Sequence, residues 1–374
     1  MRIGIITLHK VLNFGSALQA YALQHFLEKQ GYTETELIDY KYPNKFHKGK
    51  FKLDKPTIRI FLGTFKDFIF NKRRDTNRRF RDFYKEYFNL SPQEYKSIEQ
   101  IEKDPPLYDL YITGSDQVWN VNTLKNDPVM YCSFAPQNAE IISFGSSFTN
   151  KTLPVKYQED VKRRLKRYKK IGVREQSSIE ILIDLGLTSH KEVMVTCDPT
   201  LLLTKEDYHE LALKSELKIE DDFILVYGLT YAYNPEPALS SIVDNVARQL
   251  NCKVYTLWFR HPHFKSEHKE IWGIGPCEFC YLFEHAKFII TSSFHGTMFS
   301  VINRKPFVSI VPRKNEKDTR IKDFLDKVGL KQNYVFADST DYQLNMENVY
   351  NNSVEDNISS IISESIDFLL SALK

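Results

Sequence analysis

The sequence of 374 residues lacks long apolar runs, paired cysteines and any large excess of charge. No stretch approaches the roughly 18 consecutive apolar residues that cross a bilayer, which argues against a membrane-spanning chain. The strand-like start Ile3–Leu8 lacks the longer apolar core and cleavage site of a secretion signal. The 51 Lys and Arg and 48 Asp and Glu leave a net charge of +3, too little to imply nucleic-acid binding over the whole surface. We therefore expect a cytoplasmic, globular protein of about two domains.

The five cysteines are odd in number and scattered, so they predict reduced thiols rather than a disulfide framework. Only Cys277 and Cys280 lie close together, as a C-x-x-C pair. A zinc site needs a second pair or suitably spaced histidines, so we interpret these two residues as part of an amphipathic helix. The histidines His261, His263 and His268 lie in a polar stretch that favours a solvated loop. We expect neither a metal nor a cofactor.

Strand-like and helix-like segments alternate along the chain. A strand over 3–8, a helix over 16–30 closed by Gly31, and a strand over 36–40 predict a βαβ unit of a parallel sheet. Further strands are predicted at 110–113, 140–143, 170–173, 193–197, 223–227, 253–258, 288–291 and 306–311. Helices are predicted at 238–250, 276–285, 296–303 and 354–373. The pattern indicates an α/β protein with two βα-rich halves, separated by the charged stretch 204–222.

One basic segment interrupts this pattern. Residues 45–85 contain eight Lys, six Arg and four Asp, a local net charge of +10, with eight Phe interleaved. Ile58, Phe61, Phe65, Phe68 and Ile69 recur at helical spacing. We interpret the segment as a helical insertion packed by its Phe face. Contact with an anionic membrane surface or with an anionic substrate are the alternatives. Nucleic acid is the least favoured partner, because no recognition motif accompanies the charge.

The loops that follow the predicted strands are the places to search for a site, because ligands of doubly wound sheets bind beyond the carboxyl ends of the strands. In the first such loop, Asn13 and Gly15 precede a helix whose amides could face an anion. Neither the dinucleotide fingerprint nor a P-loop occurs here or elsewhere, which disfavours hydride transfer and ATP hydrolysis. In the second loop, Asp116, Gln117 and Asn120 lie beside the indole of Trp119, a mixture that recognises sugars. The alternative is that Asp116 caps a helix and Trp119 is a core residue.

Two later loops add charge and proton chemistry. Arg174 directly follows an apolar strand, where a guanidinium can bind a carboxylate or phosphate with two hydrogen bonds. Its alternative role is an ion pair with an acid such as Glu175 or Asp198. In the loop after the predicted strand 288–291, hydroxyls and a histidine follow the strand, and a glycine opens a helix; these residues are Ser292, Ser293, His295, Gly296 and Thr297. A histidine titrates near neutral pH, and neighbouring hydroxyls and helix amides can hold an oxyanion, so we predict a catalytic His295.

In these segments the sequence resembles the polysaccharide pyruvyl transferase family. The matching segments, in the family's order, are 4–7, 13–24, 114–120, 173–175, 198–202, 292–297, 319–321 and 325–330. The resemblance implies a GT-B-like architecture of two Rossmann-like domains that face a cleft. The first domain would cover 1–215 with an insertion at about 45–105, and the second 216–350. The helix 354–373 would pack back on the first domain.

The resemblance also implies a reaction. Pyruvate would move from phosphoenolpyruvate onto two hydroxyls of a sugar or lipid-linked glycan, as a ketal, in cell-surface or exopolysaccharide biosynthesis. His295 would exchange the proton and Asp116 would orient or deprotonate the acceptor. Donor binding would fall to Arg174, Ser292, Ser293, Gly296, Thr297 and Arg320. The cleft would be lined by Asn13, Gly15, Gln117, Trp119 and Asp198.

One position departs from the family. Members of the characterised type carry an arginine two residues before the histidine, where this chain has Ser293. Arg313 or Arg320 could replace the missing guanidinium from a neighbouring loop. The alternatives are a GT-B glycosyltransferase that uses a nucleotide sugar and a non-catalytic glycan-binding protein of the same fold. For the basic segment 45–85, contact with the inner face of an anionic membrane stays an expectation.

Overall fold

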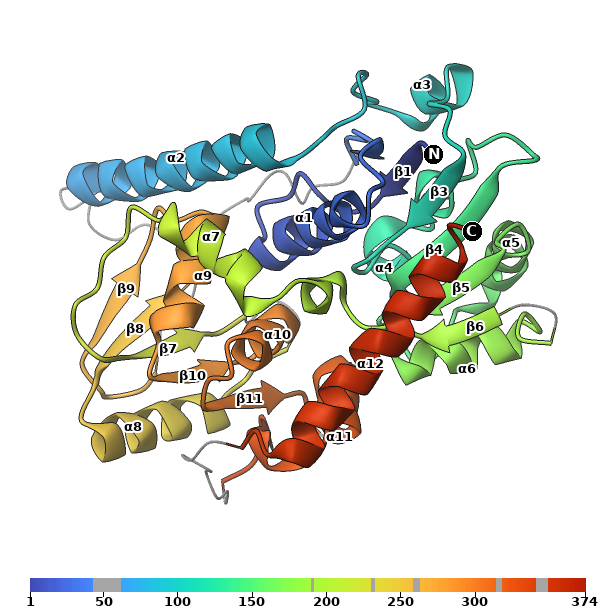
Figure 1. The fold of residues 1–374 in the computed structure, drawn as a ribbon. Helices are drawn as coiled ribbons and strands as arrows, with labels where there is room; N and C mark the ends of the chain where they lie inside the picture. The colour runs from blue at the N-terminus through green and yellow to red at the C-terminus, as the bar shows by residue number, and fades with distance from the viewer. Residues whose placement is uncertain (43–61, 190–191, 230–232, 258–262, 314–317, 341–348) are drawn as a thin grey trace.

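The computed structural model describes residues 1–42, 62–189, 192–229, 233–257, 263–313, 318–340 and 349–374, with backbone only for 62–73. These residues form two parallel sheets of six strands with helices around them (Figure 1). The predicted α/β class is therefore confirmed. Ile58 and Phe61 of the basic segment, and His261 of the histidine group, lie outside the described residues.

The first sheet has the strand order β2-β1-β3-β4-β5-β6, with every neighbouring pair parallel. Its strands are β1 (Ile3–Ile6), β2 (Thr35–Leu37), β3 (Leu110–Thr113), β4 (Glu140–Ser146), β5 (Lys170–Val173) and β6 (Glu192–Val195). The helices of this half are α1 (Phe14–Lys29), α2 (Leu62–Tyr87), α3 (Ile98–Lys103), α4 (Val121–Leu124), α5 (Val155–Leu165) and α6 (Gln176–Asp184). Strands β1 and β3 are buried along their whole length, as in sheets covered on both faces.

The second sheet has the order β12-β11-β10-β7-β8-β9 and is also parallel throughout. Its strands are β7 (Phe223–Tyr227), β8 (Lys253–Leu257), β9 (His268–Ile271), β10 (Phe288–Thr291), β11 (Phe307–Val311) and β12 (Tyr334–Phe336). The helices of this half are α8 (Ala238–Leu250), α9 (Pro276–His285), α10 (Phe294–Ile302) and α11 (Arg320–Val328). The link α7 (Lys205–Leu213) precedes it, and α12 (Asn352–Ser371) follows it.

Strands β9 and β12 were not predicted, because both are short and β9 is largely polar. The expectation that His268 lies in a solvated loop is wrong: it opens β9 and pairs with Val254 of β8. The cysteine interpretation is confirmed, since Cys277 and Cys280 lie in α9 and all five cysteines are free.

Capping residues extend two of the predicted helices toward their N-termini. Helix α1 begins at Phe14, two residues before the prediction, because the Asn13 side chain accepts a hydrogen bond from the Ser16 amide. Ser293 does the same for the Gly296 amide, so α10 begins at Phe294 and His295 lies in its first turn. Gly31 has a φ of 93° just after α1, as its predicted role requires.

Both sheets reverse their strand order near the middle. In the first, β1 pairs with β2 on one side and β3 on the other; in the second, β7 pairs with β8 and β10. Such reversals leave a crevice beyond the carboxyl ends of the two strands between which the order reverses, β1 and β3 in the first sheet and β7 and β10 in the second, where ligands of open α/β sheets bind. The segments after β1, β3, β7 and β10 are thus the expected positions of a site.

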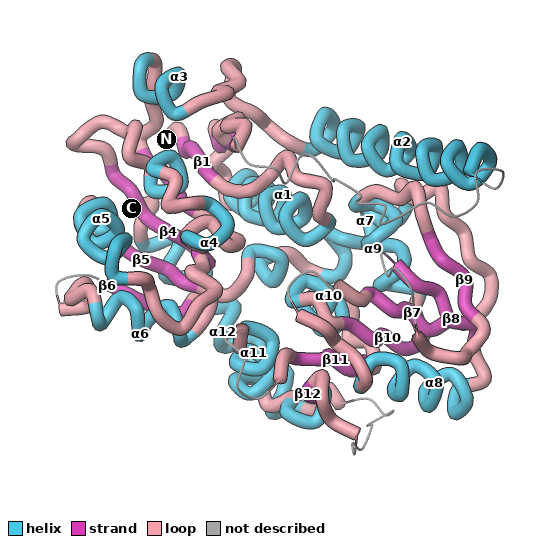
Figure 2. The backbone as a smooth tube through the Cα atoms, turned by 180° about the vertical axis from the view of Figure 1, so that it is seen from behind, coloured by secondary structure: helices cyan, strands magenta, loops and turns pink. Residues whose placement is uncertain are grey.

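Two helices connect the halves. Helix α12 passes from α11 toward the first sheet (Figure 1), where Ser365 accepts a hydrogen bond from the Cys197 amide and Ser371 one from Lys170. Helix α2 lies over the contact between the halves (Figures 1 and 2) and touches α9, where Arg79 is paired to Glu278. Phe80, on the same helix, is fully buried. No helix among the described residues is both long and apolar enough to cross a bilayer.

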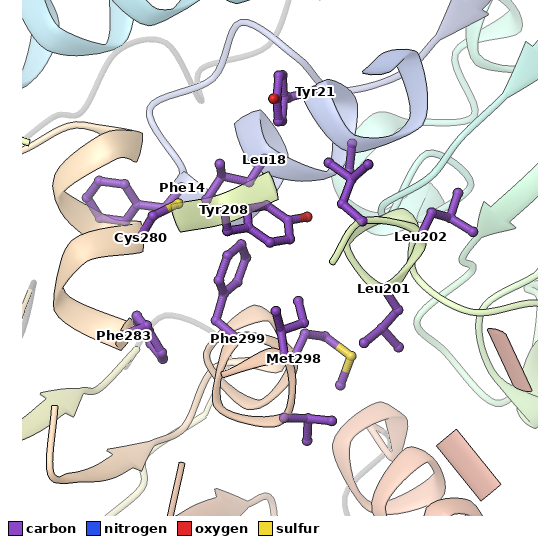
Figure 3. Packing of buried hydrophobic residues seen from close by; sticks show 14 of the residues in the cluster. Phe14, Leu18, Tyr21, Leu201, Leu202, Tyr208, Cys280, Phe283, Met298 and Phe299 are labelled. Atoms are coloured by element: carbon purple, nitrogen blue, oxygen red, sulfur yellow. The ribbon is translucent and has the colours of Figure 1, made fainter. Parts of the chain in front are cut away.

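One apolar core passes through the contact between the halves. Phe14 of α1 stacks on Phe279 of α9 with ring centroids 4.9 Å apart, and it also contacts Phe80 of α2. Tyr208 of α7 meets Phe299 of α10 at 4.8 Å. Figure 3 shows these helices turning their apolar side chains toward one another. Because this surface is apolar and shared, separating the halves would expose it to water.

We predict that Phe14→Ala destabilises both halves together. Losing a fully buried phenylalanine costs about 3–5 kcal/mol, and here the cavity would open between the halves. Urea unfolding followed by far-UV circular dichroism and tryptophan fluorescence should give one transition, shifted to lower urea. Leu213→Ala is the control, because Leu213 is 57% exposed, and it should change stability by less than about 0.5 kcal/mol. Two separate transitions, with only one shifted, would contradict the shared core.

Candidate active site between the two sheets

A buried ion pair lies beyond the carboxyl ends of β5 and β6. Arg174 Nη1 donates to Asp198 Oδ2 at 2.9 Å, and both side chains are at most 1% exposed. Asp198 is fixed in turn by the amide and hydroxyl of Thr200, which bond to its Oδ1 at 3.1 and 2.7 Å. Of the two acids considered as ion-pair partners for Arg174, the structure thus pairs it with Asp198.

Asp116 adds a second carboxylate on the other side of Arg174. Its Oδ1 lies 3.6 Å from Arg174 Nη2, and its Oδ2 accepts a hydrogen bond of 2.6 Å from Ser16. Asp116 has a φ of 73°, a backbone conformation that non-glycine residues adopt mainly at special sites. The segments after β3 and β5 and the first turn of α1 therefore meet at one point.

His295 reaches this cluster from the second half. Its Nε2 lies 3.5 Å from Asp198 Oδ2, at ion-pair distance. On the other side its ring lies so close to Gly15 that a Cβ at position 15 would overlap the imidazole. Gly15 is therefore required for the approach of α10 to α1, and it brings His295 against the charged groups of the first half.

The carboxyl groups of this cluster are held ionised. Burial alone would raise the pKa of Asp198, but His295 and Arg174 beside it hold that pKa well below its usual range. The same balance, with Arg174 as the leading opposing group, lowers the pKa of Asp116. The pKa of Asp318 is also lowered, because the effect of Arg320 outweighs the effect of burial.

A second guanidinium lies near the first. Arg320 donates two hydrogen bonds to Asp318, of 2.9 and 2.6 Å, and its guanidinium carbon lies 5.7 Å from the ring centroid of Phe294. Arg174 contacts the same ring at 4.5 Å. One aromatic ring thus gathers two cations at the start of α10. Sequence reasoning missed Phe294 and Asp318; the signal available was an aromatic residue directly before His295.

Several buried polar atoms converge here without a hydrogen-bond partner in the described part of the chain. They are Arg174 Nε and Nη2, His295 Nε2 and Glu175 Oε2. The other oxygen of Glu175 accepts hydrogen bonds from Ser147 and Ser178. Burial raises the pKa of Glu175 despite the nearby Arg174, so this acid takes up a proton more readily than usual. Buried polar atoms are nearly always paired, so donors and an acid left unpaired at one point indicate a place for a polar ligand.

The hydroxyls predicted to bind the donor are engaged within the protein. Ser292 exchanges two hydrogen bonds with the backbone of Leu229, at 2.7 and 3.0 Å. Ser293 caps α10. Thr297 bonds to the Ser293 carbonyl and to Ser309, and Gly296 packs against Thr291. These residues build the turn that presents His295, and their direct contact with a donor stays a prediction.

The cleft-lining residues divide into two groups. Asn13 and Gln117 lie near the cluster, but Asn13 caps α1 and Gln117 accepts a hydrogen bond from Asn120. The prediction that Trp119 lines the cleft is wrong. Its indole is 1% exposed, stacks on Tyr131 and donates to the Met130 carbonyl at 3.1 Å. Trp119 is therefore a core residue without a free face for a sugar.

The fold and the site define a two-domain α/β protein of the GT-B type, with charged groups gathered between two strand-order reversals. Among solved structures, a putative UDP-N-acetylglucosamine 2-epimerase from Listeria monocytogenes is similar at a TM-score of 0.52 and 10% identity, covering 98% of this chain and 87% of that one. The UDP-GlcNAc 2-epimerase of Methanocaldococcus jannaschii, solved with UDP-GlcNAc and UDP, is similar at 0.50 and 14%, covering 97% and 100%. Such low identities establish the fold alone.

The sequence itself gives the family. The model of the polysaccharide pyruvyl transferase family matches residues 13–314, most of the chain. The chain therefore belongs to this family and is a transferase, which confirms the resemblance found in its motifs. No curated protein sequence matches it. Among the described residues, no three His, Cys, Asp or Glu side chains come together as a metal site would require.

We predict that Asp198→Asn destabilises the protein most at neutral pH. The lowered pKa of Asp198 means that its contribution is complete above the ordinary aspartate pKa near 4 and is lost as the pH falls toward the folded-state value. Breaking the buried pair costs about 3–5 kcal/mol. Urea unfolding at pH 7, 5 and 3.5 should show that difference shrinking at the lowest pH. Asp221→Asn, which removes an exposed ion pair with Lys253, is the control. It should cost less than about 1 kcal/mol of stability at all three pH values. A pH-independent cost at Asp198 would contradict this.

Proposed function

We propose that this chain transfers the pyruvyl group of phosphoenolpyruvate to two hydroxyls of a sugar, as a ketal, in cell-surface or exopolysaccharide biosynthesis. The observation that carries this proposal is the convergence, between the two sheets, of buried nitrogen atoms of Arg174 and His295 that make no hydrogen bond within the described residues, although two of them lie at ion-pair distance from Asp116 and Asp198. Phosphoenolpyruvate carries a carboxylate and a phosphate, and a guanidinium binds either with two parallel hydrogen bonds. Family membership supports the same reaction.

The residues at the site have the chemistry that each step needs. Protonation of the methylene carbon of phosphoenolpyruvate makes C2 electrophilic, and we assign the proton to His295. A sugar hydroxyl then adds to C2 and loses its proton to a base, for which Asp116 is the candidate. The bond from C2 to the phosphate oxygen breaks, and inorganic phosphate leaves with the proton held by Asp116. The second hydroxyl then adds to C2, gives its proton to His295, and closes the ketal. Arg174 would face the carboxylate of the donor or the negative charge that the departing phosphate gains, at a buried position where fixed charges act strongly.

Arg320 is our candidate for the guanidinium that the family carries two residues before the histidine. Ser293 at that position is committed to capping α10. Arg320 lies near the same Phe294 ring as Arg174, and Asp318 fixes its orientation. Arg313 is exposed, which favours Arg320 as the replacement.

The second candidate function is that of a GT-B glycosyltransferase, supported by the likeness of the fold to enzymes solved with nucleotide sugars. Because one fold carries many reactions, this likeness does not choose the donor. A glycan-binding protein without catalysis is the third. In the two enzymatic candidates, the acceptor would be a sugar or a lipid-linked glycan at the cytoplasmic side of a membrane.

Helix α2 has a basic, exposed face that suits a peripheral contact with that membrane. Arg74, Arg78, Arg81 and Lys85 are all exposed and recur every three or four residues, which places them along one side of the helix. Within the part of the chain that the structure describes, Arg78 is the one of these four with an ion pair, to Asp82 at 3.5 Å. Such a row of cations is attracted to anionic lipid headgroups, at about 1 kcal/mol for each charge near the surface.

We predict that phosphoenolpyruvate stabilises the folded protein through Arg174 and Arg320. A ligand that binds only the folded state at 100 times its Kd adds about 2.7 kcal/mol to stability. Arg174→Lys and Arg320→Lys keep the positive charge but lose the second parallel hydrogen bond, and each should weaken binding about tenfold or more. Thermal unfolding with phosphoenolpyruvate, UDP and GDP in parallel measures this.

Arg313→Lys is the matched control and should bind like the unchanged protein. Stabilisation by a nucleotide alone would overturn the pyruvyl donor in favour of the glycosyltransferase. If phosphoenolpyruvate binds, its phosphate should be released in the presence of a glycan acceptor, and His295→Ala should abolish that release while leaving the fold intact. Release that persists in His295→Ala would remove the assigned proton donor.

We predict salt-sensitive binding to anionic vesicles through α2. Arg74→Gln combined with Arg81→Gln should weaken binding to phosphatidylserine vesicles about 30-fold, because two charges at about 1 kcal/mol each are lost. Sedimentation of vesicles at 50 and 300 mM salt measures this. Arg163→Gln with Lys166→Gln, two exposed cations of the α5 region, is the control pair. Equal binding by both double variants would end the proposal for α2.

A further inference from the structure

A cavity of about 210 Å³ lies beside the candidate active site, beyond the carboxyl ends of β1 and β2. Among its lining residues are Thr7, His9, Lys10, Tyr40, Tyr42 and Glu94. The cluster of Arg174, Asp198 and His295 contributes nothing to this lining, and none of the roles assigned so far uses these residues. The space equals that of about seven water molecules, which is room for one small polar ring.

Two buried atoms, one in the cavity lining and one behind it, have no hydrogen-bond partner among the described residues. His9 Nε2 and Asp39 Oδ1 lie 3.5 Å apart, on side chains that are 1% and 8% exposed. The other ring nitrogen of His9 lies 3.1 Å from the Thr7 carbonyl, which can only accept, so Nδ1 carries a proton. The lining residue His9 and the carboxylate behind it thus retain hydrogen-bonding capacity that the protein itself leaves unused.

The charges around this point nearly balance. Lys10 donates to Asp39 Oδ2 at 2.6 Å, which neutralises the cation next to the cavity. Burial would raise the pKa of Asp39, but the neighbouring His9 and the Lys10 ammonium that bonds to its Oδ2 outweigh burial and lower that pKa. At the rim, Lys41 and Glu94 bring one charge of each sign. This balance suits a neutral polar ligand better than a phosphate.

Two rigid aromatic rings form part of the wall. The Tyr40 hydroxyl donates to Asp127 at 3.0 Å, and the Tyr42 hydroxyl donates to the Thr123 carbonyl at 3.2 Å. Both rings are at least 95% buried and are held by these bonds. Fixed aromatic surfaces combined with a few hydrogen-bonding groups are typical of sites for small polar rings such as sugars.

The cavity is joined to the proposed acceptor base by direct hydrogen bonds. Thr7, in the cavity lining, donates to the Ser115 carbonyl at 2.9 Å, and Ser115 directly precedes Asp116. Gln19 clamps the same two residues, donating to Thr7 Oγ1 at 3.0 Å and accepting from the Ser115 amide at 3.2 Å. A molecule in the cavity would therefore lie at the same edge of the sheet as Asp116.

We propose that this cavity binds one neutral sugar residue of the acceptor glycan, adjacent to the sugar that reacts at Asp116. The assignment rests on the proposed transfer to a sugar for its role in the reaction, but the cavity's affinity for a sugar can be measured alone. His9 and Lys10 hydrogen-bond its hydroxyls, and the rings of Tyr40 and Tyr42 contact its carbon face.

Saturation-transfer NMR with neutral methyl glycosides tests this assignment on the full chain. The probes are the methyl glycosides of galactose, glucose, mannose, N-acetylglucosamine and N-acetylgalactosamine, with inorganic phosphate titrated separately. At least one glycoside should bind, and Lys10→Met and His9→Gln should each weaken it at least fivefold. Lys269→Met, an exposed lysine of the second half, is the matched control and should bind as before.

Thermal stabilisation by phosphoenolpyruvate is measured on the same variants. It should be unchanged in Lys10→Met, which shows that the fold and the donor site are intact. Donor stabilisation without any glycoside signal that depends on His9 and Lys10 overturns the sugar subsite and leaves the transfer reaction standing. Glycoside binding at the cavity without donor stabilisation overturns the reaction and leaves the subsite. Binding of inorganic phosphate at this cavity, without binding of any of the glycosides, also overturns the assignment.

Discussion

The buried pair of Arg174 and Asp198 is the interaction around which the two halves are arranged. A charge taken out of water is costly unless it is paired and hydrogen-bonded, so each of these groups requires the other in place. Asp198 also receives Thr200 from its own loop and His295 from the opposite half. The carboxyl ends of one sheet and the first turn of α10 are thereby held at fixed positions. The apolar core through Phe14 and Phe279 resists separation of the same two parts, so charge and apolar burial act together.

This arrangement gives the site cations whose charge is already placed before a ligand arrives. Arg174 and Arg320 are each held by a carboxylate and gathered at the ring of Phe294. An anionic substrate therefore needs little rearrangement of the protein, which is the condition under which fixed charges are most effective. Ser293 has a structural role at the position where the family carries an arginine. By capping α10, it fixes the turn that carries His295. In our proposal, Arg320 of α11 supplies the guanidinium instead.

The sequence allowed the alternating α/β order and the segments of the site to be predicted, because strand ends of parallel sheets converge and apolar strands are easily recognised. Trp119 could not be decided in that way, since the same residue beside polar neighbours suits a core or a cleft; only its contact with Tyr131 settles the matter. Strand β9 escaped because its polar residues form a strand through pairing with β8 rather than through their own preference. The pair of Arg320 and Asp318 and the Phe294 ring depend on tertiary contacts that no local pattern encodes.

The contact between Gly15 and His295 has a consequence for how a proton can move. Because the ring lies directly against the backbone of α1 on its Nδ1 side, that face of the imidazole is closed by protein. In the proposed reaction, Nε2, which lies 3.5 Å from Asp198 Oδ2, would be the nitrogen that exchanges protons with a bound molecule. Delivery and recovery of a proton would then use one and the same atom, in turn, on one side of the ring. In the proposed reaction, Gly15 at the start of the first helix thus determines which nitrogen of His295, in the opposite half, exchanges protons.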